Sequence, residues 1–351
     1  MNSLSHNLSQ LHSSPLVCIC IPTYNSAATI RETVTSILAQ TYFNLVVHVS
    51  DNASTDDTLK IIESFPDPRI TIHRNNVNAG GEGNFNRCIQ FSEGKYTAIF
   101  HADDIYEQDI VAKQVAYLEE HPNVGVAFTA AKTIDNVGCI TGLVGLTGQP
   151  GNVNTSYDFK SLFKIILKRG NFIVCPSAMV RTNIYKYEIE SWRGDLFRSS
   201  SDLDVWLRIA KAHSVVFLSE PLMRYRVDSN QFSHKVRLRT ERADLFLVIE
   251  YYLELSDTKL FLTSIDLKNY KLLLNNDSAW RAINNYMAGN IVGAKILLRS
   301  VFNVYSIRAS LSSRRDMATL VVCIFLRLTI FLGLNRLGVR VLSYFRGKLN
   351  R

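Results

Sequence analysis

Three short polar segments, each directly after a strand-like apolar run, contain the residues best suited to chemistry. Thr23, Tyr24 and Asn25 follow VCICIP, Asp51 follows LVVHVS, and Asp103 and Asp104 end the run FHADD. In an open α/β sheet the carboxyl ends of parallel strands meet at one edge, where ligands bind. Adjacent carboxylates supply the oxygen ligands that Mg²⁺ and Mn²⁺ prefer, and backbone amides at a helix N-terminus bind phosphate. The sequence therefore predicts a ligand-binding site at this edge, with adjacent carboxylates in it.

The elements that must position these residues alternate along the chain. Apolar periodicity and turn residues predict strands at about 16–21, 45–50, 70–73, 96–101 and 124–130. The same patterns predict helices at about 27–39, 56–64, 82–93 and 106–120. Crossovers of this length indicate an α/β fold, with a mostly parallel Rossmann-like sheet flanked by helices. The Gly-, Thr- and Asn-rich stretch at about 131–160 indicates a hairpin or a flexible loop.

The motifs VCICIPTYN, VSDNASTDD and FHADDIY, in this order and spacing, resemble those of inverting family 2 glycosyltransferases of GT-A fold. The resemblance covers about residues 16–232. It implies transfer of a sugar from a nucleotide diphosphate sugar, a UDP-sugar before dTDP or GDP sugars, to an acceptor hydroxyl. It also implies a Mg²⁺ or Mn²⁺ cofactor. Relatives of this length act in surface polysaccharide biosynthesis, so the implied acceptor is a lipid-linked saccharide.

The donor-binding residues that the resemblance implies are spread over the strand ends and the loops beside them. Asp51 is expected to accept the imide N–H of uracil, although a simple turn before the next helix also explains Asp51 and Asn52. The full expected set is Pro22, Thr23, Tyr24, Asn25, Asp51, Asn52, Asn78, Gly81, Arg87, Ala102, Asp103 and Arg226.

The expected metal ligands are Asp103 and Asp104. The family pattern is Asp-x-Asp-Asp, whereas this chain has His101 at the first position. Imidazole suits Mn²⁺ better than Mg²⁺. Two roles that involve no metal are favoured for His101: donation to ribose or phosphate, and simple packing.

A catalytic base is expected in the segment SSSDLDVWLRIA. The resemblance aligns Asp202 with the base of the family, with Ser201 in place of a Glu. Asp204 is expected to cap the helix or to support the site. The alternative is that either aspartate is only an N-cap, which is common before a helix.

Two other classes of function compete with the transferase. The run GGEGNFN suggests a dinucleotide fingerprint, but position 86 is Asn where a third glycine is required, which argues against an oxidoreductase. The second alternative is a non-catalytic, membrane-associated nucleotide-sugar-binding partner of a polysaccharide assembly complex. His101 and Ser201, at positions that are usually acidic, suggest it.

Composition limits the partners and the location. The chain has 351 residues, of which 47% are hydrophobic and 20% charged, and its formal charge is +8. The cysteines lack paired metal-site spacing and no signal-peptide pattern opens the chain, so we expect a cytoplasmic protein. Basic residues gather near the C-terminus among apolar stretches, which favours a membrane surface over nucleic acid as partner. The expected location is therefore peripheral, on the inner face of the cell membrane.

Three regions are expected along the chain. Residues 1–14 form a flexible leader, 15–240 a GT-A domain and 241–351 a helical extension with basic, apolar helices. The GT-A domain has a donor half at about 15–130 and an acceptor half at about 131–240. Residues 318–334 have three alternatives: attachment to a membrane surface, which is favoured, packing on the globular domain, or a true span.

Overall fold

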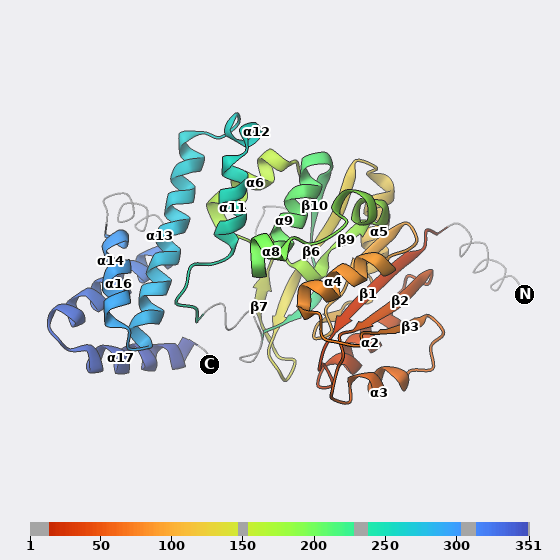
Figure 1. Ribbon diagram of the computed structural model, residues 1–351, viewed down its shortest axis with the longest axis horizontal. Coiled ribbons are helices and arrows are strands. Elements are labelled where there is room, and N and C mark those ends of the chain that lie inside the picture. Colours follow the sequence, from red (N-terminus) through yellow and green to blue (C-terminus); the bar gives the residue numbers. More distant parts are fainter. Residues whose placement is uncertain (1–13, 147–153, 228–237, 303–313, 350–351) are drawn as a thin grey trace, which may run out of the picture. The chain divides into compact units, whose positions relative to one another are not determined.

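The computed structural model describes residues 14–146, 154–227, 238–302 and 314–349. The chain forms two compact units (Figure 1). The first contains Met1–Phe163 and Asn171–Asp228, and the second contains Lys164–Gly170 and Ser229–Arg351. Most of the predicted leader lies outside the described residues. The division of the first unit into donor and acceptor halves stays a prediction.

A ten-stranded sheet in the described residues is the frame of the first unit, with the main order β3-β2-β1-β4-β9-β6-β10-β5. Strands β1 to β4, β6 and β10 run in one direction, while the short strands β5, β7, β8 and β9 run against them. The predicted α/β fold with a mostly parallel sheet is therefore confirmed. The strand bounds are β1 Val17–Thr23, β2 Leu45–Asp51, β3 Ile70–Arg74, β4 Tyr96–Ile99, β5 Ile105–Tyr106, β6 Val124–Ile134, β7 Ile140–Val144, β8 Thr155–Tyr157, β9 Met179–Arg181 and β10 Ser214–Arg226.

Helices cover this sheet with amphipathic faces. In α2 the buried side chains are Ile30, Thr33, Val34 and Ile37, a spacing that puts them on one helical face toward the core. Helix α4 packs on β1 and β2 (Figure 1). The bounds are α2 Ile30–Leu38, α3 Thr58–Glu63, α4 Gly80–Phe91, α5 Ile110–Glu120, α7 Thr182–Ile184, α8 Gly194–Phe197 and α9 Ser201–Ala212, with short 3₁₀ and π turns at η1 Cys175–Ser177, η2 Tyr185–Ile189 and η3 Arg198–Ser200. Helix α6, Phe159–Arg169, begins in the first unit and continues into the second.

The predicted hairpin after residue 130 is present. Strand β6 pairs antiparallel with β7, and the Asp135 carboxylate accepts backbone N–H groups of Val137 and Cys139 in the connecting turn. This turn fixes the reversal, since a carboxylate can bond to backbone groups two to four residues ahead. Residues 147–153 of the predicted loop lie outside the described residues.

The second unit is helical. Its core joins α13, α14 and α16 through Ala282, Tyr286, Leu298, Cys323 and Leu326, and Val339 and Leu342 of α17 pack against it. Thr263 and Asp266 form a reciprocal capping box that fixes the start of α13. The bounds are α11 Leu245–Glu254, α12 Ser256–Lys259, α13 Ser264–Met287, α14 Ile291–Val301, α16 Arg314–Phe331 and α17 Asn335–Leu349.

Helix α16 contains most of the apolar stretch for which a membrane span was one alternative. Among the described helices, none combines the length and the apolar character that a bilayer crossing requires. One face of α16 is instead used for packing, with Cys323 and Leu326 fully buried.

Candidate functional site

The edge formed by the ends of β1 and β2 presents the first group of predicted residues. Thr23 and Asp51 are paired in register, so the loops that follow both strands emerge side by side. Asn25 has a φ of 49°, and its side-chain oxygen accepts the Thr55 N–H at 2.8 Å. This contact ties the two loops together in a conformation that Asn tolerates better than most residues. Between them the Tyr24 side chain is 48% exposed, while Pro22 is half-buried.

Only one of the two carboxylate oxygens of Asp51 has a hydrogen-bond partner among the described residues. Oδ2 accepts the Ser54 N–H at 3.1 Å, but Oδ1 is buried with no hydrogen-bond partner among the described residues. A buried acceptor without a donor is costly. A ligand N–H at this edge would remove that cost, which is what the predicted contact with a base requires.

The side chains of the buried Asn52 and the exposed Asn78 form a hydrogen bond with each other. The Asn52 amide donates to Asn78 Oδ1 at 2.8 Å, and its oxygen accepts from Asn75 and from the Ala79 N–H. These bonds shape the turn that enters α4, where Gly81 has open space beside it. A direct ligand role for Asn52 and Asn78 stays a prediction.

Arg87 lies one helical turn before Phe91. Its guanidinium sits over the Phe91 ring at 5.6 Å, and that ring stacks on His73. Its predicted contact with the nucleotide stays a prediction.

His101, Asp103 and Asp104 form a cluster that has the composition of a metal site. One potential ligand atom from each residue lies within 4.8 Å of the others. Asp104 is completely buried, and its Oδ2 has no hydrogen-bond partner among the described residues. His101 Nε2 is likewise buried without a partner. These two unpartnered atoms, beside the second acidic residue Asp103, fit a divalent cation, because coordination would satisfy both.

Backbone contacts hold this cluster in place. The Ala102 carbonyl accepts hydroxyl groups of Thr29 and Thr33 from α2, at 2.9 and 3.0 Å. The Tyr106 hydroxyl accepts the His101 N–H at 2.7 Å. Ala102 therefore contributes to loop geometry through its carbonyl, and its predicted contact with the donor stays a prediction.

Burial and neighbouring charge disfavour the ionised form of Asp104. Loss of solvent raises the pKa of its carboxyl well above the usual value, and the charge of Asp103 acts in the same direction. The backbone N–H of Arg226, which donates to Asp104 Oδ1 at 2.8 Å, opposes this shift. A cation at the cluster would oppose it more strongly.

Arg226, predicted to bind the donor, ties two loops and helix α2 together. Its Nε donates to the Asp103 carbonyl at 2.9 Å, Nη1 to the Asp135 carbonyl at 3.1 Å, and Nη2 pairs with Glu32 at 2.7 Å. It is 5% exposed, so most of its donors are used inside the protein. The structure thus gives Arg226 an organising role, and its predicted contact with the donor stays a prediction.

Asp202 lies in the first turn of α9, and the N-cap of that helix is Ser200, so the simple N-cap alternative does not apply to Asp202. Burial raises the pKa of Asp202 to about 6, and hydrogen bonds from Leu203 and Asn171 limit the rise. Loss of solvent raises the pKa of the half-buried Cys175 thiol, and the charges of Asp202 and Asp104 act in the same direction. Both acids thus influence the same thiol, and a joint site of Asp202 with the predicted metal ligands stays a prediction.

Asp204 supports the fold of this region. It is fully buried between two guanidinium groups, with Arg208 Nε at 2.9 Å from Oδ2 and Arg193 donating to both oxygens. Because the Asp204 carboxylate is fully buried and both of its oxygens accept hydrogen bonds from arginines, it cannot contact a substrate. The supporting role predicted for Asp204 agrees with this geometry.

An aromatic wall connects the cluster to α9. The Phe85 ring meets His101 edge-on at 5.5 Å and stacks on Trp192 at 4.4 Å, and Trp192 meets Trp206 at 6.4 Å. Trp192 and Trp206 are buried, as expected of wall and core residues.

Sequence reasoning missed Asn171, Cys175 and Tyr106. Asn171 and Cys175 belong to NFIVCPS, whose polar residues flank an apolar run, but no spacing rule links them to an acid about 30 residues later. Tyr106 follows the acidic pair directly, and its contact with His101 depends on the turn between them.

The chain matches the description "Glycosyl transferase family 2" over residues 18–186. It is 30% identical over 234 residues to the uncharacterized glycosyltransferase MJ1057 of Methanocaldococcus jannaschii, covering 65% of this chain and 76% of that protein. It is 38% identical over 104 residues to the Escherichia coli UDP-Glc:alpha-D-GlcNAc-diphosphoundecaprenol beta-1,3-glucosyltransferase WfaP, covering 30% and 41% of the two chains. The crystal structure of S. aureus TarS 1-349 in complex with UDP-GlcNAc is similar in fold, with a TM-score of 0.54, 17% identity and coverage of 95% and 92%.

Proposed function

Since the chain belongs to glycosyltransferase family 2 and is a glycosyltransferase, we propose that it moves a sugar from a UDP-sugar to a hydroxyl of a lipid-linked saccharide, with inversion, in surface polysaccharide biosynthesis. The name of the relative WfaP, which specifies UDP-Glc and a diphosphoundecaprenol-linked acceptor, supports this donor and acceptor class. The observation that carries the proposal is the metal-type cluster of His101, Asp103 and Asp104, in which His101 Nε2 and Asp104 Oδ2 are buried and have no hydrogen-bond partner among the described residues.

The donor would lie across the ends of β1 and β2. The unpartnered Asp51 Oδ1 would accept the imide N–H of uracil, and the exposed Tyr24 ring would pack beside the base or ribose. The sugar diphosphate would then extend toward the loop at 101–104.

Asp103, Asp104 and His101 would hold the cation. When bound, a divalent ion supplies Lewis-acid stabilisation of the negative charge that develops on the leaving diphosphate. We include His101 because its Nε2 atom lies in the cluster and has no hydrogen-bond partner in the part of the chain that the structure describes. Among Mg²⁺ and Mn²⁺, a set with one imidazole nitrogen favours Mn²⁺.

Asp202 would take the proton from the acceptor hydroxyl. With a pKa of about 6 it is ionised at neutral pH but is a stronger base than an ordinary aspartate. Attack by that hydroxyl from the side opposite the diphosphate forms the new glycosidic bond as the bond to the leaving group breaks. The freed proton ends on the Asp202 carboxylate.

The C-terminal unit would keep the enzyme at the inner face of the membrane, where a lipid-linked acceptor is exposed. Its sequence combines basic residues with apolar stretches, as expected of helices that lie on an anionic surface.

Release of UDP and formation of saccharide product on a diphosphate-lipid acceptor test this proposal. We expect turnover that requires a divalent cation and that is lost in Asp103→Asn and Asp202→Asn. The control Asp57→Asn removes an exposed acid outside the cluster and should retain wild-type activity. Donor binding without any turnover in the wild-type protein would refute the transferase and support the non-catalytic partner.

A further inference from the structure

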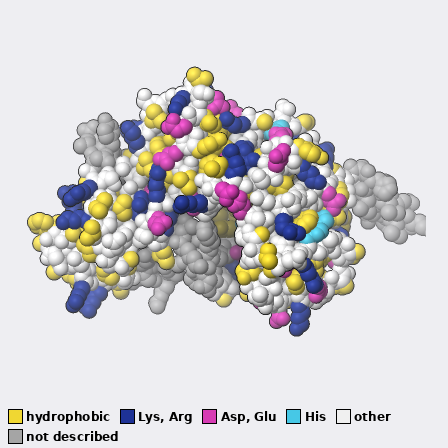
Figure 2. All heavy atoms as spheres, in the orientation of Figure 1, with side chains coloured by type: hydrophobic (Ala, Val, Ile, Leu, Met, Phe, Trp, Pro, Cys, Tyr) yellow, Lys and Arg dark blue, Asp and Glu magenta, His cyan; other side chains and the backbone are white. Residues whose placement is uncertain are grey.

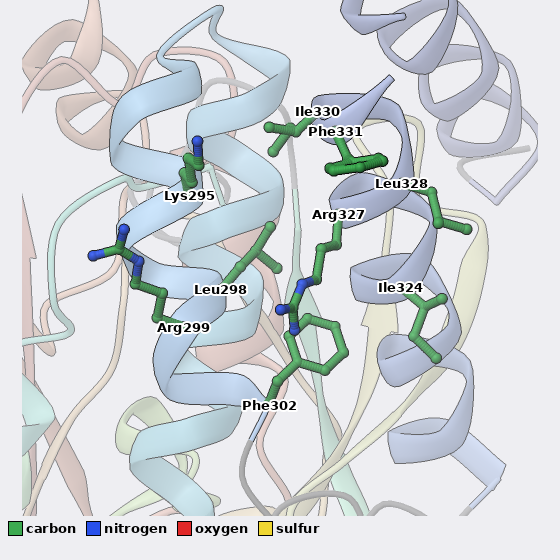
Figure 3. A pocket seen from close by; sticks show the side chains of 9 residues that line it. All are labelled: Lys295, Leu298, Arg299, Phe302, Ile324, Arg327, Leu328, Ile330 and Phe331. Carbon is green, nitrogen blue, oxygen red and sulfur yellow. The ribbon is translucent and has the colours of Figure 1, made fainter. Parts of the chain in front are cut away.

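A cavity of about 610 Å³ lies in the C-terminal helical unit, between α14 and α16 (Figure 3). Helix α14 contributes Lys295, Leu298, Arg299 and the adjacent Phe302, and α16 contributes the remaining lining residues Ile324, Arg327, Leu328, Ile330 and Phe331. The walls are therefore apolar, with three cationic side chains among them. This combination suits an amphiphile that has an anionic head.

The three cations have no acidic partner among the described residues. Figure 3 shows Arg327 extending from α16 toward α14, and its guanidinium lies over the Phe302 ring at 4.9 Å. Lys295 and Arg299 are exposed, one turn apart on α14, and Figure 3 shows Arg299 directed away from α16, at the rim. Their charges remain available to an anion from outside.

The sequence around the cavity is strongly basic. From Ser278 to Arg351 it contains twelve Lys or Arg residues and a single acid, Asp316. Figure 2 shows Lys, Arg and hydrophobic side chains reaching the surface of this helical part together. Such a surface attracts anionic membranes.

An exposed apolar stripe runs along α16, and three of its four members, Ile324, Leu328 and Phe331, also line the cavity. Val321, Ile324, Leu328 and Phe331 are 59%, 44%, 54% and 85% exposed. Their spacing of three, four and three residues puts them on one helical face, separate from the buried Cys323 and Leu326. A contiguous exposed apolar face next to unpaired cations is typical of a helix that contacts the interfacial layer of a bilayer.

We propose that α14 and α16 form a binding site for the phosphate headgroup of an anionic membrane lipid. Lys295, Arg299 and Arg327 meet the phosphate, and the stripe on α16 meets the hydrocarbon chains. This inference rests on the membrane attachment in the proposed function and gives that attachment its residues and its chemistry. It requires no catalytic step.

Co-sedimentation of the full chain with vesicles tests the site. Wild-type protein should bind vesicles of phosphatidylcholine with phosphatidylglycerol and not vesicles of phosphatidylcholine alone. The double variant Lys295→Gln, Arg299→Gln should lower partitioning roughly thirtyfold, since each basic residue near an anionic surface contributes about 1 kcal/mol. The matched variant Lys268→Gln, Lys271→Gln removes the same charge from exposed positions on α13 and should bind like wild type. Equal loss in both variants, or wild-type binding that does not depend on phosphatidylglycerol, would overturn the site.

A second pair of measurements identifies the source of the phosphate and the hydrophobic contribution. Phe331→Ser should weaken vesicle binding, because it removes a highly exposed ring from the stripe. Inorganic phosphate at millimolar concentration should not displace the protein from vesicles. Displacement by inorganic phosphate, or unchanged binding of Phe331→Ser, would contradict a lipid site.

The proposed transferase activity and the proposed lipid site can be tested independently of each other. Hydrolysis of a UDP-sugar, measured in solution without vesicles, should be equal in wild type and in the α14 double variant. Vesicle binding that depends on Lys295 and Arg299 in a protein without transferase activity would refute the catalytic proposal alone. Transferase activity without any vesicle binding would refute the lipid site alone.

Discussion

Replacement of Asp202 by Asn should make the protein more stable and less active. The folded-state pKa of Asp202 is about 6, against an ordinary value of 3.8. Between these two values the unfolded chain binds fewer protons than the folded one, so stability falls as pH rises from about 4 to 6 and stays lower above that. A difference of about two pKa units corresponds to ~3 kcal/mol, which is an upper limit because the side chain is partly exposed.

The gain in stability should therefore depend on pH. At pH 7, Asp202→Asn should raise the free energy of unfolding by up to ~3 kcal/mol, and near pH 4 the gain should be close to zero. Urea titrations of wild type and variant at the two pH values measure it. An equal effect at both pH values, or a loss of stability at pH 7, would show that burial does not raise the pKa of Asp202.

The same substitution should also change the activity and its pH dependence. A base with a pKa of about 6 should make wild-type kcat/KM fall about tenfold per pH unit below that value. Asp202→Asn should lower kcat by about 10²–10⁴-fold and remove this acid limb. A variant that stays within a few-fold of wild type, or that keeps the acid limb, would refute Asp202 as the base.

The remaining predictions concern the cation, the base-binding edge and the support of α9. His101→Asp should shift the ratio of Mn²⁺ to Mg²⁺ affinity toward Mg²⁺, on the order of tenfold, in calorimetric titration of the protein without substrate; an unchanged ratio would exclude His101 as a ligand. Asp51→Ala should weaken UDP binding by about 10- to 100-fold and leave pyrophosphate binding unchanged, and equal losses for both would place Asp51 away from the base. Asp204→Asn should destabilise the protein by about 1–3 kcal/mol at pH 7, opposite in sign to Asp202→Asn, because it leaves two partly buried guanidinium groups with a neutral partner; a neutral result by urea titration would contradict the ion-pair role.

The first four strands of the sheet and the helices between them were largely predictable from the sequence. Strong β-branched runs at 17–23 and 45–51, each followed by a helical pattern, leave few alternatives to parallel pairing, and the structure pairs these strands in parallel. The short strand β9 between β4 and β6 was not predictable, since three residues give no periodic signal and its pairing depends on both neighbours.

For the candidate site, the sequence indicated which acids follow which strands but not how each side chain is used. Asp103 and Asp104 are neighbours, yet only the fold shows that Asp104 is fully buried and bonded to the backbone of Arg226, 122 residues later. Asp202 and Asp204 are two residues apart in one helix, and only the positions of Arg193 and Arg208 show that Asp204 is fully paired. Long-range partners of this kind are set by tertiary packing, which local patterns do not encode.

The bond between Asp104 and the Arg226 backbone has a consequence for the order of assembly during synthesis. Asp104 obtains this donor, and the Asp103 carbonyl obtains its guanidinium partner, from the last residue of β10. A nascent chain that has formed β1 to β4 but has not yet added β10 holds the acidic loop without either contact. The central strands are thus able to form early, whereas the acidic loop reaches its final geometry only after nearly the whole first unit has left the ribosome.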